Sequence, residues 1–238
     1  MRHPLLVRAL LGGAGLAGCV ILLSQAARAA DMGTAAEQPI TITGRAIAPS
    51  ISGTLTVAVK PVRFYEDWER ARRDSTRNPR LRSLIAPARE LMPDQQIHYV
   101  QAAVPRLIRW RSDATEWGSH DYWASATETL ERGYGDEEDR AIVKMQALLA
   151  LGFSPRDLYL TIGRDRVGGQ VIVLIVRHKQ LYYVLDDTGA APYLTGRRPE
   201  FTPMLTFGYG GFWLHGYPAR KPDAATASAA ATTAAASK

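Results

Sequence analysis

Cysteine is almost absent from this chain of 238 residues: the single one, Cys19, can form neither an intrachain disulfide nor a cysteine zinc site. The sequence also lacks the G-x-S-x-G, P-loop, H-E-x-x-H, EF-hand and G-x-G-x-x-G patterns. Histidine is scarce, and the four histidines after the N-terminal region are not at metal-ligand spacing: His98, His120, His178 and His215. These absences exclude the familiar short signatures of hydrolases, nucleotide-binding proteins and zinc enzymes.

Long apolar runs are also missing, except at the N-terminus. There, a short basic region precedes the apolar stretch 9–23, and Ala27-Arg28-Ala29 has the A-x-A pattern of a cleavage site. We therefore expect residues 1–29 to be a secretory signal peptide, which places the mature protein in the periplasm or outside the cell, with no transmembrane segment. Leu16-Ala17-Gly18-Cys19 resembles a lipobox, so a lipid anchor on Cys19 is the alternative.

Charge and composition divide the remainder of the chain. The formal net charge is +6, and Arg2, Arg8 and Arg28 account for half of it, so the rest is only mildly basic and argues against nucleic-acid binding. Residues 30–50 are small and polar and predict a linker. Residues 51–221 have the composition of one globular domain. The tail 222–238 is almost all Ala, Thr and Ser, which predicts disorder.

Hydrophobic periodicity predicts helices first and strands later. Helical spacing is found in 64–76, in a segment starting at Pro93, and in 136–151. Alternating or continuously apolar runs predict strands at 54–59, 158–162, 171–176 and 181–185, with a closing hairpin around 207–214. This order of elements predicts an α+β fold.

The most informative stretch is 109–186, which holds four dense motifs in a fixed order. They are Arg109-Trp110-Arg111-Ser112-Asp113, Asp121-Tyr122-Trp123-Ala124-Ser125, Glu128-Thr129-Leu130 and Gly135-Asp136-Glu137-Glu138-Asp139. Together they resemble the bacterial transglutaminase-like cysteine peptidases, the LapG-like periplasmic family, with its patterns Y-R-S-D, D-Y-W-A-[ST]-P-x-E-T-L and G-D-C-E-D. The resemblance extends over about residues 64–217. It implies a papain-like or transglutaminase-like α+β fold, with helices packed on an antiparallel sheet.

The same resemblance implies a degenerate catalytic triad. In the family, a cysteine at a helix start is the nucleophile, a histidine on a strand is the base, and an aspartate orients the histidine. The matching positions here are Glu137, Val171 and Asp186. The nucleophile and the base are therefore both missing, which predicts a catalytically inactive member, a pseudoenzyme. Two further motif residues, Trp123 and Glu128, are interpreted as supports of the site, mainly through packing.

Two further interpretations concern the acids. The family binds calcium through carboxylates that flank its cysteine, and Asp136, Glu138 and Asp139 occupy those positions, so the resemblance implies a calcium site. A solvated acidic helix start is the alternative. Glu137 and Asp186 could also form a carboxylate pair in a hydrolase of altered chemistry.

The resemblance finally implies a partner class. Active relatives release surface adhesins and are held by an inner-membrane receptor. An inactive copy is expected to bind a peptide or protein in the periplasm, such as an adhesin segment or that receptor. A calcium-dependent structural module without a peptide groove is the third hypothesis.

Overall fold

The computed structural model of the chain describes residues 49, 51–60, 63–118, 121–196 and 201–217. The predicted signal peptide (1–29) and disordered tail (222–238) lie outside the described residues, as does nearly all of the predicted linker (30–50). All described residues belong to the unit Thr41–Lys238. None of the described helices has the length and hydropathy that a membrane span requires.

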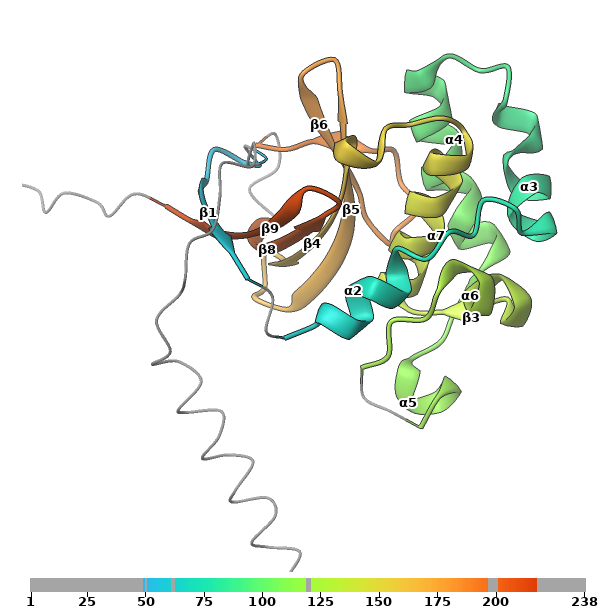
Figure 1. The fold of residues 1–238 in the computed structure, drawn as a ribbon, viewed down its shortest axis with the longest axis horizontal. Coiled ribbons are helices and arrows are strands. Elements are labelled where there is room, and N and C mark those ends of the chain that lie inside the picture. Colours follow the sequence, from blue (N-terminus) through green and yellow to red (C-terminus); the bar gives the residue numbers. More distant parts are fainter. Residues whose placement is uncertain (1–48, 50, 61–62, 119–120, 197–200, 218–238) are drawn as a thin grey trace, which may run out of the picture. The chain divides into compact units, whose positions relative to one another are not determined.

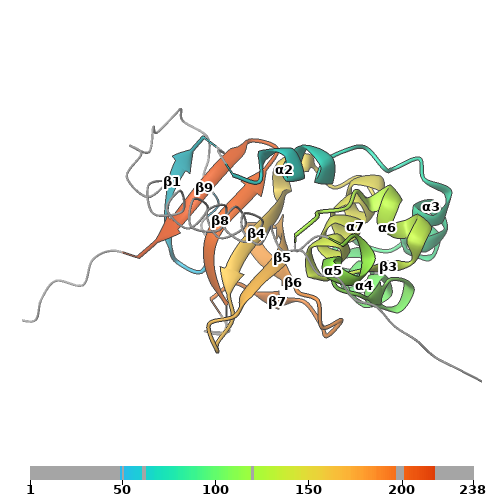
Figure 2. The same cartoon turned by 90° about the horizontal axis from the view of Figure 1, so that it is seen from below.

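A helical layer covers one part of a large antiparallel sheet, which confirms the predicted α+β class (Figure 1). The helices of the described residues are α2 (Tyr65–Ala71), α3 (Pro79–Ile85), α4 (Pro93–Leu107), α5 (Asp113–Glu116), α6 (Ala126–Arg132) and α7 (Glu137–Ala150). Short 3₁₀ turns are found at Ala86–Ala88 and Pro155–Asp157. Seen from below, α3, α4, α5 and α6 gather around α7 on one side of the strands (Figure 2).

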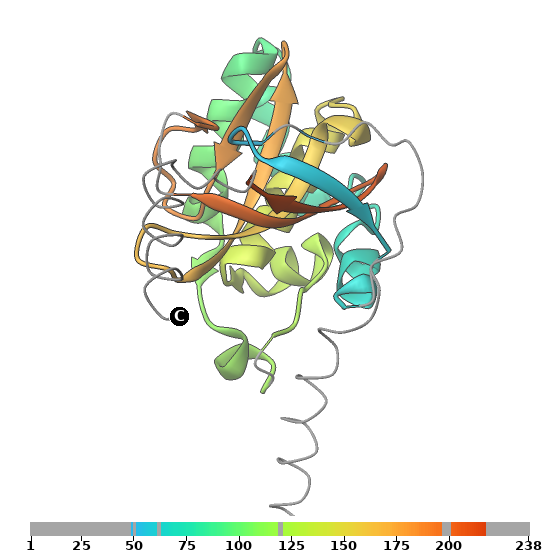
Figure 3. The same cartoon turned by 90° about the vertical axis from the view of Figure 1, so that its left-hand side faces the viewer.

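The sheet has seven strands in the described part of the chain, in the order β1-β9-β8-β4-β5-β6-β7, and all neighbours are antiparallel. Their bounds are β1 Leu55–Val59, β4 Leu158–Arg164, β5 Gln170–His178, β6 Leu181–Leu185, β7 Tyr193–Leu194, β8 Thr202–Gly208 and β9 Gly211–Gly216. Figure 3 shows β1, in blue, at the near edge of the sheet, beside the dark orange β9. The predicted strands and the closing hairpin are confirmed.

Strand β5 explains why its sequence is continuously apolar. Successive side chains of a strand point to opposite faces. Ile172 and Leu174 belong to the larger core beneath the helices, whereas Val173 and Ile175 belong to a smaller core on the other face. Both faces of the strand are therefore covered, as the unbroken apolar run predicted.

Helix α7 is the central helix, and it packs against β5, α4 and α6. Its apolar side chains Ile142, Met145 and Leu148 are fully buried. The predicted helix 136–151 is confirmed with slightly different ends: Asp136 is the N-cap, and the helix ends at Ala150. Gly152 follows with φ of 95°, a left-handed conformation that favours glycine after a helix.

The first predicted helix was too long. Helix α2 ends at Ala71, and the segment predicted as its continuation leads into α3, which the apolar spacing did not reveal. The local signal for α3 is its start, where the Asn78 side chain accepts hydrogen bonds from two backbone N–H groups and Pro79 occupies the first turn. Pro105 does not break α4, because it lies in the last turn of that helix.

Candidate functional site

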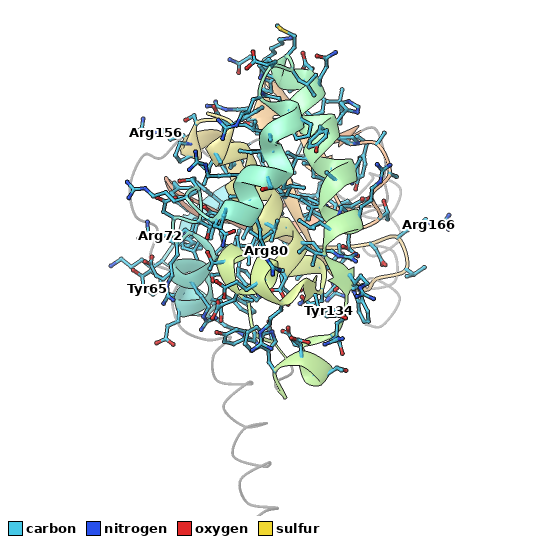
Figure 4. The ribbon with its side chains drawn as sticks, turned by 90° about the vertical axis from the view of Figure 1, so that its right-hand side faces the viewer. Tyr65, Arg72, Arg80, Tyr134, Arg156 and Arg166 are labelled. Carbon is cyan, nitrogen blue, oxygen red and sulfur yellow. The ribbon has the colours of Figure 1, made fainter. Side chains whose placement is uncertain are left out.

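A short parallel strand pair joins two of the sequence motifs. In β2 (Arg109–Trp110) and β3 (Tyr134–Gly135), Arg109 pairs with Tyr134 and Trp110 with Gly135. One residue beyond β2, the Arg111 N–H donates a hydrogen bond of 3.1 Å to the Gly135 carbonyl. The Arg111 guanidinium also lies 3.5 Å from the centre of the Tyr134 ring, on the lower part of the face in Figure 4. This pairing brings the chain after β2 to the start of α7.

Gly135 has a steric reason to be glycine. A Cβ atom at this position would lie 2.6 Å from the Asp139 Cβ and 3.1 Å from the Thr129 Cγ2. The first contact does not fit, because real Cβ atoms do not approach a neighbour so closely, and the second would require Thr129 to shift. The glycine therefore permits the close approach of β3 to the first turn of α7.

The motif before α6 builds the frame of the site. Ser125 caps α6 by accepting a hydrogen bond from the Glu128 N–H, and the Glu128 carboxylate accepts one from the Ser125 N–H at 2.8 Å. The Tyr122 hydroxyl donates to the same carboxylate at 3.2 Å. Trp123 is fully buried and stacks on Phe64 with 5.7 Å between ring centres. Both Trp123 and Glu128 thus have the packing roles expected from the sequence.

Helix α6 is further tied to α3 by an arginine. The Arg80 guanidinium donates to the Leu130 carbonyl at 2.6 Å and to the Glu131 carbonyl at 3.1 Å, and so binds the otherwise unpaired C-terminal end of α6. Figure 4 shows Arg80 in the middle of the helical face.

Six carboxylates meet at the start of α7, and we call them the acidic cluster: Asp113, Asp121, Asp136, Glu137, Glu138 and Asp139. Oxygen atoms of Asp113, Asp136 and Asp139 lie within 4.8 Å of one another, and the same holds for Asp113, Asp121 and Glu138 and for Asp136, Glu137 and Glu138. The three expected metal ligands are therefore brought together in overlapping groups. Asp113 and Asp121 were not among the expected ligands, although both stand in the motifs that resemble the family.

The deepest members of the cluster are incompletely satisfied. Asp113, Asp136 and Asp139 are 3%, 7% and 1% exposed. Asp139 accepts a hydrogen bond of 2.8 Å from the Ala124 N–H, and Asp113 accepts one from the Tyr122 N–H. The Oδ1 atoms of Asp113 and Asp136 have no donor within the described residues. Buried carboxylate oxygens without a donor are costly, so these atoms call for a cation or a proton.

Protonation is favoured in the absence of a metal. Burial, followed by the negative charge of Asp136, raises the pKa of Asp139 to about 8. Burial also raises the pKa of Asp136, with the charges of Asp113 and Glu137 next, and the pKa of Glu138, with the charge of Asp136 next. None of the six carboxylates forms an ion pair within the described part of the chain. A close set of anionic oxygen ligands with two buried unpaired atoms fits calcium, a hard divalent cation.

A pocket of about 140 Å³ opens beside the cluster. Glu137, Glu138, Asp121 and Val171 are among its lining residues, together with Phe64, Trp123, Ile162, Gln170 and Ile172. Glu137 accepts a hydrogen bond of 3.3 Å from the Trp110 indole N–H. The position matching the family's cysteine and the position matching its histidine thus border the same pocket.

The position that matches the family's histidine lies on β5, and its neighbours on this strand face opposite sides of the sheet. Val171 packs against the smaller core on the face away from the helices, whereas Ile172 belongs to the larger core beneath them. Either residue, as well as Gln170, borders the pocket. None of the three side chains can accept a proton at neutral pH.

Asp186, the third triad position, is not a lining residue of this pocket. Its Oδ1 accepts hydrogen bonds from the Gln101 amide at 3.1 Å and from the Thr188 hydroxyl at 2.6 Å. Its carbonyl accepts one of 2.5 Å from the buried Lys144 ammonium. The structure therefore brings Glu137 and Val171 together but places Asp186 in a network that fastens the end of β6 to α4 and α7.

Comparisons with known proteins identify the family and agree with the fold. The sequence model of the bacterial transglutaminase-like cysteine proteinases matches residues 54–192, which is more than half of the chain. No curated protein matches. Calcium-bound LapG of Legionella pneumophila has 25% sequence identity and a TM-score of 0.50, over 58% of this chain and 80% of LapG. The EGTA-treated LapG structure has 24% identity and a TM-score of 0.51, over 68% and 90%.

Proposed function

Because the chain belongs to the bacterial transglutaminase-like cysteine proteinase family, we propose that it is a catalytically inactive member of that family. In this proposal, the pocket at the start of α7 binds a segment of a peptide or protein partner. The acidic cluster binds calcium and holds the pocket in shape.

The observation that carries the proposal is the composition of the pocket where Glu137 and the candidate histidine positions meet. Among the described residues that line it there is no thiol, hydroxyl or imidazole, and their titratable groups are the carboxylates of Asp121, Glu137 and Glu138. Cys19 is the only cysteine of the whole sequence, and it lies in the expected signal peptide. A cysteine-peptidase mechanism needs a thiolate and a base, and this pocket supplies neither. The argument holds whether the histidine position is Val171 or Ile172.

Catalysis by Glu137 and Asp186 is the alternative, and the contacts of Asp186 speak against it. A carboxylate pair works when both groups flank the reacting bond. The Asp186 carboxylate instead accepts hydrogen bonds from Gln101 and Thr188, outside the lining of the pocket.

Calcium would serve a structural purpose in this protein. Asp113 precedes the motif of Trp123, whereas Asp136 and Asp139 belong to the start of α7. An ion held by Asp113, Asp136 and Asp139, with Glu138 beside them, would connect these segments and offset their mutual repulsion. The description of LapG structures as calcium-bound and EGTA-treated supports the relevance of calcium in the family. A purely structural calcium module, the third hypothesis, is disfavoured by the open pocket next to the cluster.

The proposed place of action is the periplasm, and the proposed partner is a peptide or protein segment there. An adhesin segment and an inner-membrane receptor are the partners that the family resemblance implies. Both are exposed to an exported protein if residues 1–29 act as a signal peptide.

A pull-down from periplasmic extract tests this function when the wild-type chain is compared with a variant whose pocket is blocked. Val171→Trp places an indole in the pocket, and Val167→Trp is the matched control because Val167 is 84% exposed and does not line it. We expect the wild-type chain and Val167→Trp to capture the same intact partner in calcium, and Val171→Trp to lose it. Equal capture by all three chains, or capture of a partner that is cleaved, would overturn the proposal.

A further inference from the structure

The pocket carries more negative charge than a calcium ion can offset. Six carboxylates surround it or lie beneath it, and none has an ion-pair partner in the described residues. This contrasts with the whole chain, in which 29 Lys and Arg residues outnumber 23 Asp and Glu residues. One divalent ion supplies two positive charges, and its ligands would be the buried acids, so the carboxylates of Glu137 and Asp121 remain at the pocket for a second cation.

The residual charge lies toward the pocket. Asp113, Asp136 and Asp139 are buried, whereas Glu137 is half-buried and Asp121 is exposed, and the last two line the pocket. Glu137 has one hydrogen bond, from the neutral Trp110 indole, and this does not compensate its charge. Where an active relative has a cysteine, this chain therefore presents a carboxylate to whatever enters.

Trp123 and Asp121 border the pocket together, and the Trp123 side chain is fully buried. Burial raises the pKa of Asp121, and the interaction with the Trp123 indole N–H partly offsets this effect. The indole therefore helps to hold the Asp121 carboxylate at the wall of the pocket.

An apolar row of side chains leads out of the pocket across the sheet. Directly paired residues on neighbouring strands share a face, and the row runs through Ile172, Ile162, Leu205, Leu214 and Val57. Exposure increases along it: Ile172 and Ile162 are 6% and 4% exposed, Leu205 and Leu214 are half-buried, and Val57 is 41% exposed. Next to Val57 on the same face of edge strand β1, Leu55 is 60% exposed.

We propose that the pocket selects a lysine or arginine side chain of an extended peptide, and that aliphatic residues beside this cation lie on the apolar row. The inference rests on the proposed peptide-binding function and names the chemistry of its ligand. The cationic head faces Glu137 and Asp121, and the methylene stem lies against Ile162 and Ile172, an arrangement that suits long basic side chains. The chain has thus exchanged a nucleophile for a charge that recognises a cation.

A positional peptide array tests the inference. Seven-residue peptides carry a fixed central residue, which is Lys, Arg, norleucine or Glu, and mixed flanking residues, and the purified full chain is applied in calcium. We expect Lys and Arg to bind about tenfold more strongly than norleucine, since a charged hydrogen bond in a partly buried site contributes on this order. In Glu137→Gln the preference for Lys over norleucine should be lost. In Glu90→Gln, where an exposed carboxylate far from the pocket lining is removed, it should persist.

The outcomes separate the two proposals. Equal binding of the Lys and norleucine peptides, or a Lys preference that survives Glu137→Gln, overturns the cation pocket while leaving peptide binding intact. Failure of every peptide to bind overturns the proposed function and the inference with it. The array is repeated in EGTA, and a Lys preference seen only in EGTA and absent in calcium shows that the peptide occupies the metal site, which also overturns the inference.

Discussion

Asp113 and Asp136 belong to different motifs of the sequence, yet a carboxylate oxygen of one lies within 4.8 Å of a carboxylate oxygen of the other. Both side chains are buried, and in each the Oδ1 atom has no hydrogen-bond donor among the described residues. Two ionised carboxylates held in this way would repel each other, so the folded chain favours a proton or a cation at this position.

Calcium is therefore expected to raise the melting temperature of the protein. An ion that binds only the folded state stabilises it by an amount that grows with concentration. Asp136→Asn should abolish this shift, and it should also melt higher than the wild type in EGTA, because the substitution removes one repelling charge. Differential scanning calorimetry in EGTA and in millimolar calcium measures both effects. Glu131→Gln, at an exposed carboxylate of α6, is the control and should behave as wild type. The absence of heat in a calcium titration of the wild type would contradict the site.

The calcium-free protein should lose stability as the pH rises. Burial raises the pKa of Asp139 to about 8, from an ordinary value of 3.8. The folded state therefore holds this proton more tightly than the unfolded state, and its contribution to stability is lost as the pH rises through about 8. We expect the melting temperature in EGTA to fall between pH 6.5 and about pH 9, and to fall less in Asp139→Asn.

The pH range of this measurement has a lower limit, which the titration of His215 sets. Burial lowers the pKa of His215 to about 4, from 6.5, so its contribution has the opposite sign and is lost as the pH falls from 6.5 through about 4. Measurements above pH 6.5 avoid this effect. A flat melting profile in EGTA across the alkaline range would show that the cluster does not hold protons in the folded state.

The purified chain should have no peptidase activity. Among the described residues, its pocket lining holds neither a thiol nor an imidazole, so peptide libraries should remain intact and iodoacetamide should change nothing. Cys19→Ser should give the same result, which rules out a contribution from the only cysteine. Turnover that survives iodoacetamide but disappears in Glu137→Ala would instead favour carboxylate chemistry.

Restoring the missing residues tests the triad assignment. Glu137→Cys alone should be inactive, because no base lies in the pocket lining. The resemblance places the histidine at Val171, whereas the alternation of β5 turns Ile172 toward the helices. Neighbouring side chains point to opposite faces, so only one of Val171→His and Ile172→His should give weak proteolysis in combination with Glu137→Cys. That activity should require calcium, because the surrounding acids raise the pKa of the new thiol. Full activity of Glu137→Cys alone would show that both assignments are wrong.

Gly135→Ala should weaken the protein and its calcium site together. The new methyl group would lie 2.6 Å from the Asp139 Cβ, and overpacking of this kind costs about 1–3 kcal/mol. Gly216→Ala is the control, because a Cβ there meets no atom within 4 Å. Urea unfolding gives the loss of stability, and calorimetric titration gives the loss of calcium affinity. Equal stability of the two variants would contradict the close packing of β3 against α7.

The sequence alone determined the elements whose signals are local. The period of apolar residues in α7, the unbroken apolar run of β5 and the alternation of β1 were sufficient to predict these elements, because each pattern reflects burial on one or two faces. The motifs also identified the family and predicted the loss of its nucleophile and base. The sequence analysis did not predict the end of α2 or the existence of α3, because the apolar spacing does not mark the break between these helices.

Only the tertiary structure decided how the acids act. Asp113 and Asp121 had no reason to be grouped with Asp136 until the β2–β3 pair brought their segments together. The apolar row that ends at Val57 likewise depends on strand pairing between distant parts of the chain. Local patterns record which side chains are buried, whereas the distances between charges arise from long-range packing. For that reason the sequence named Asp136, Glu137, Glu138 and Asp139, whereas the fold added Asp113 and Asp121 and raised the pKa values of the buried acids.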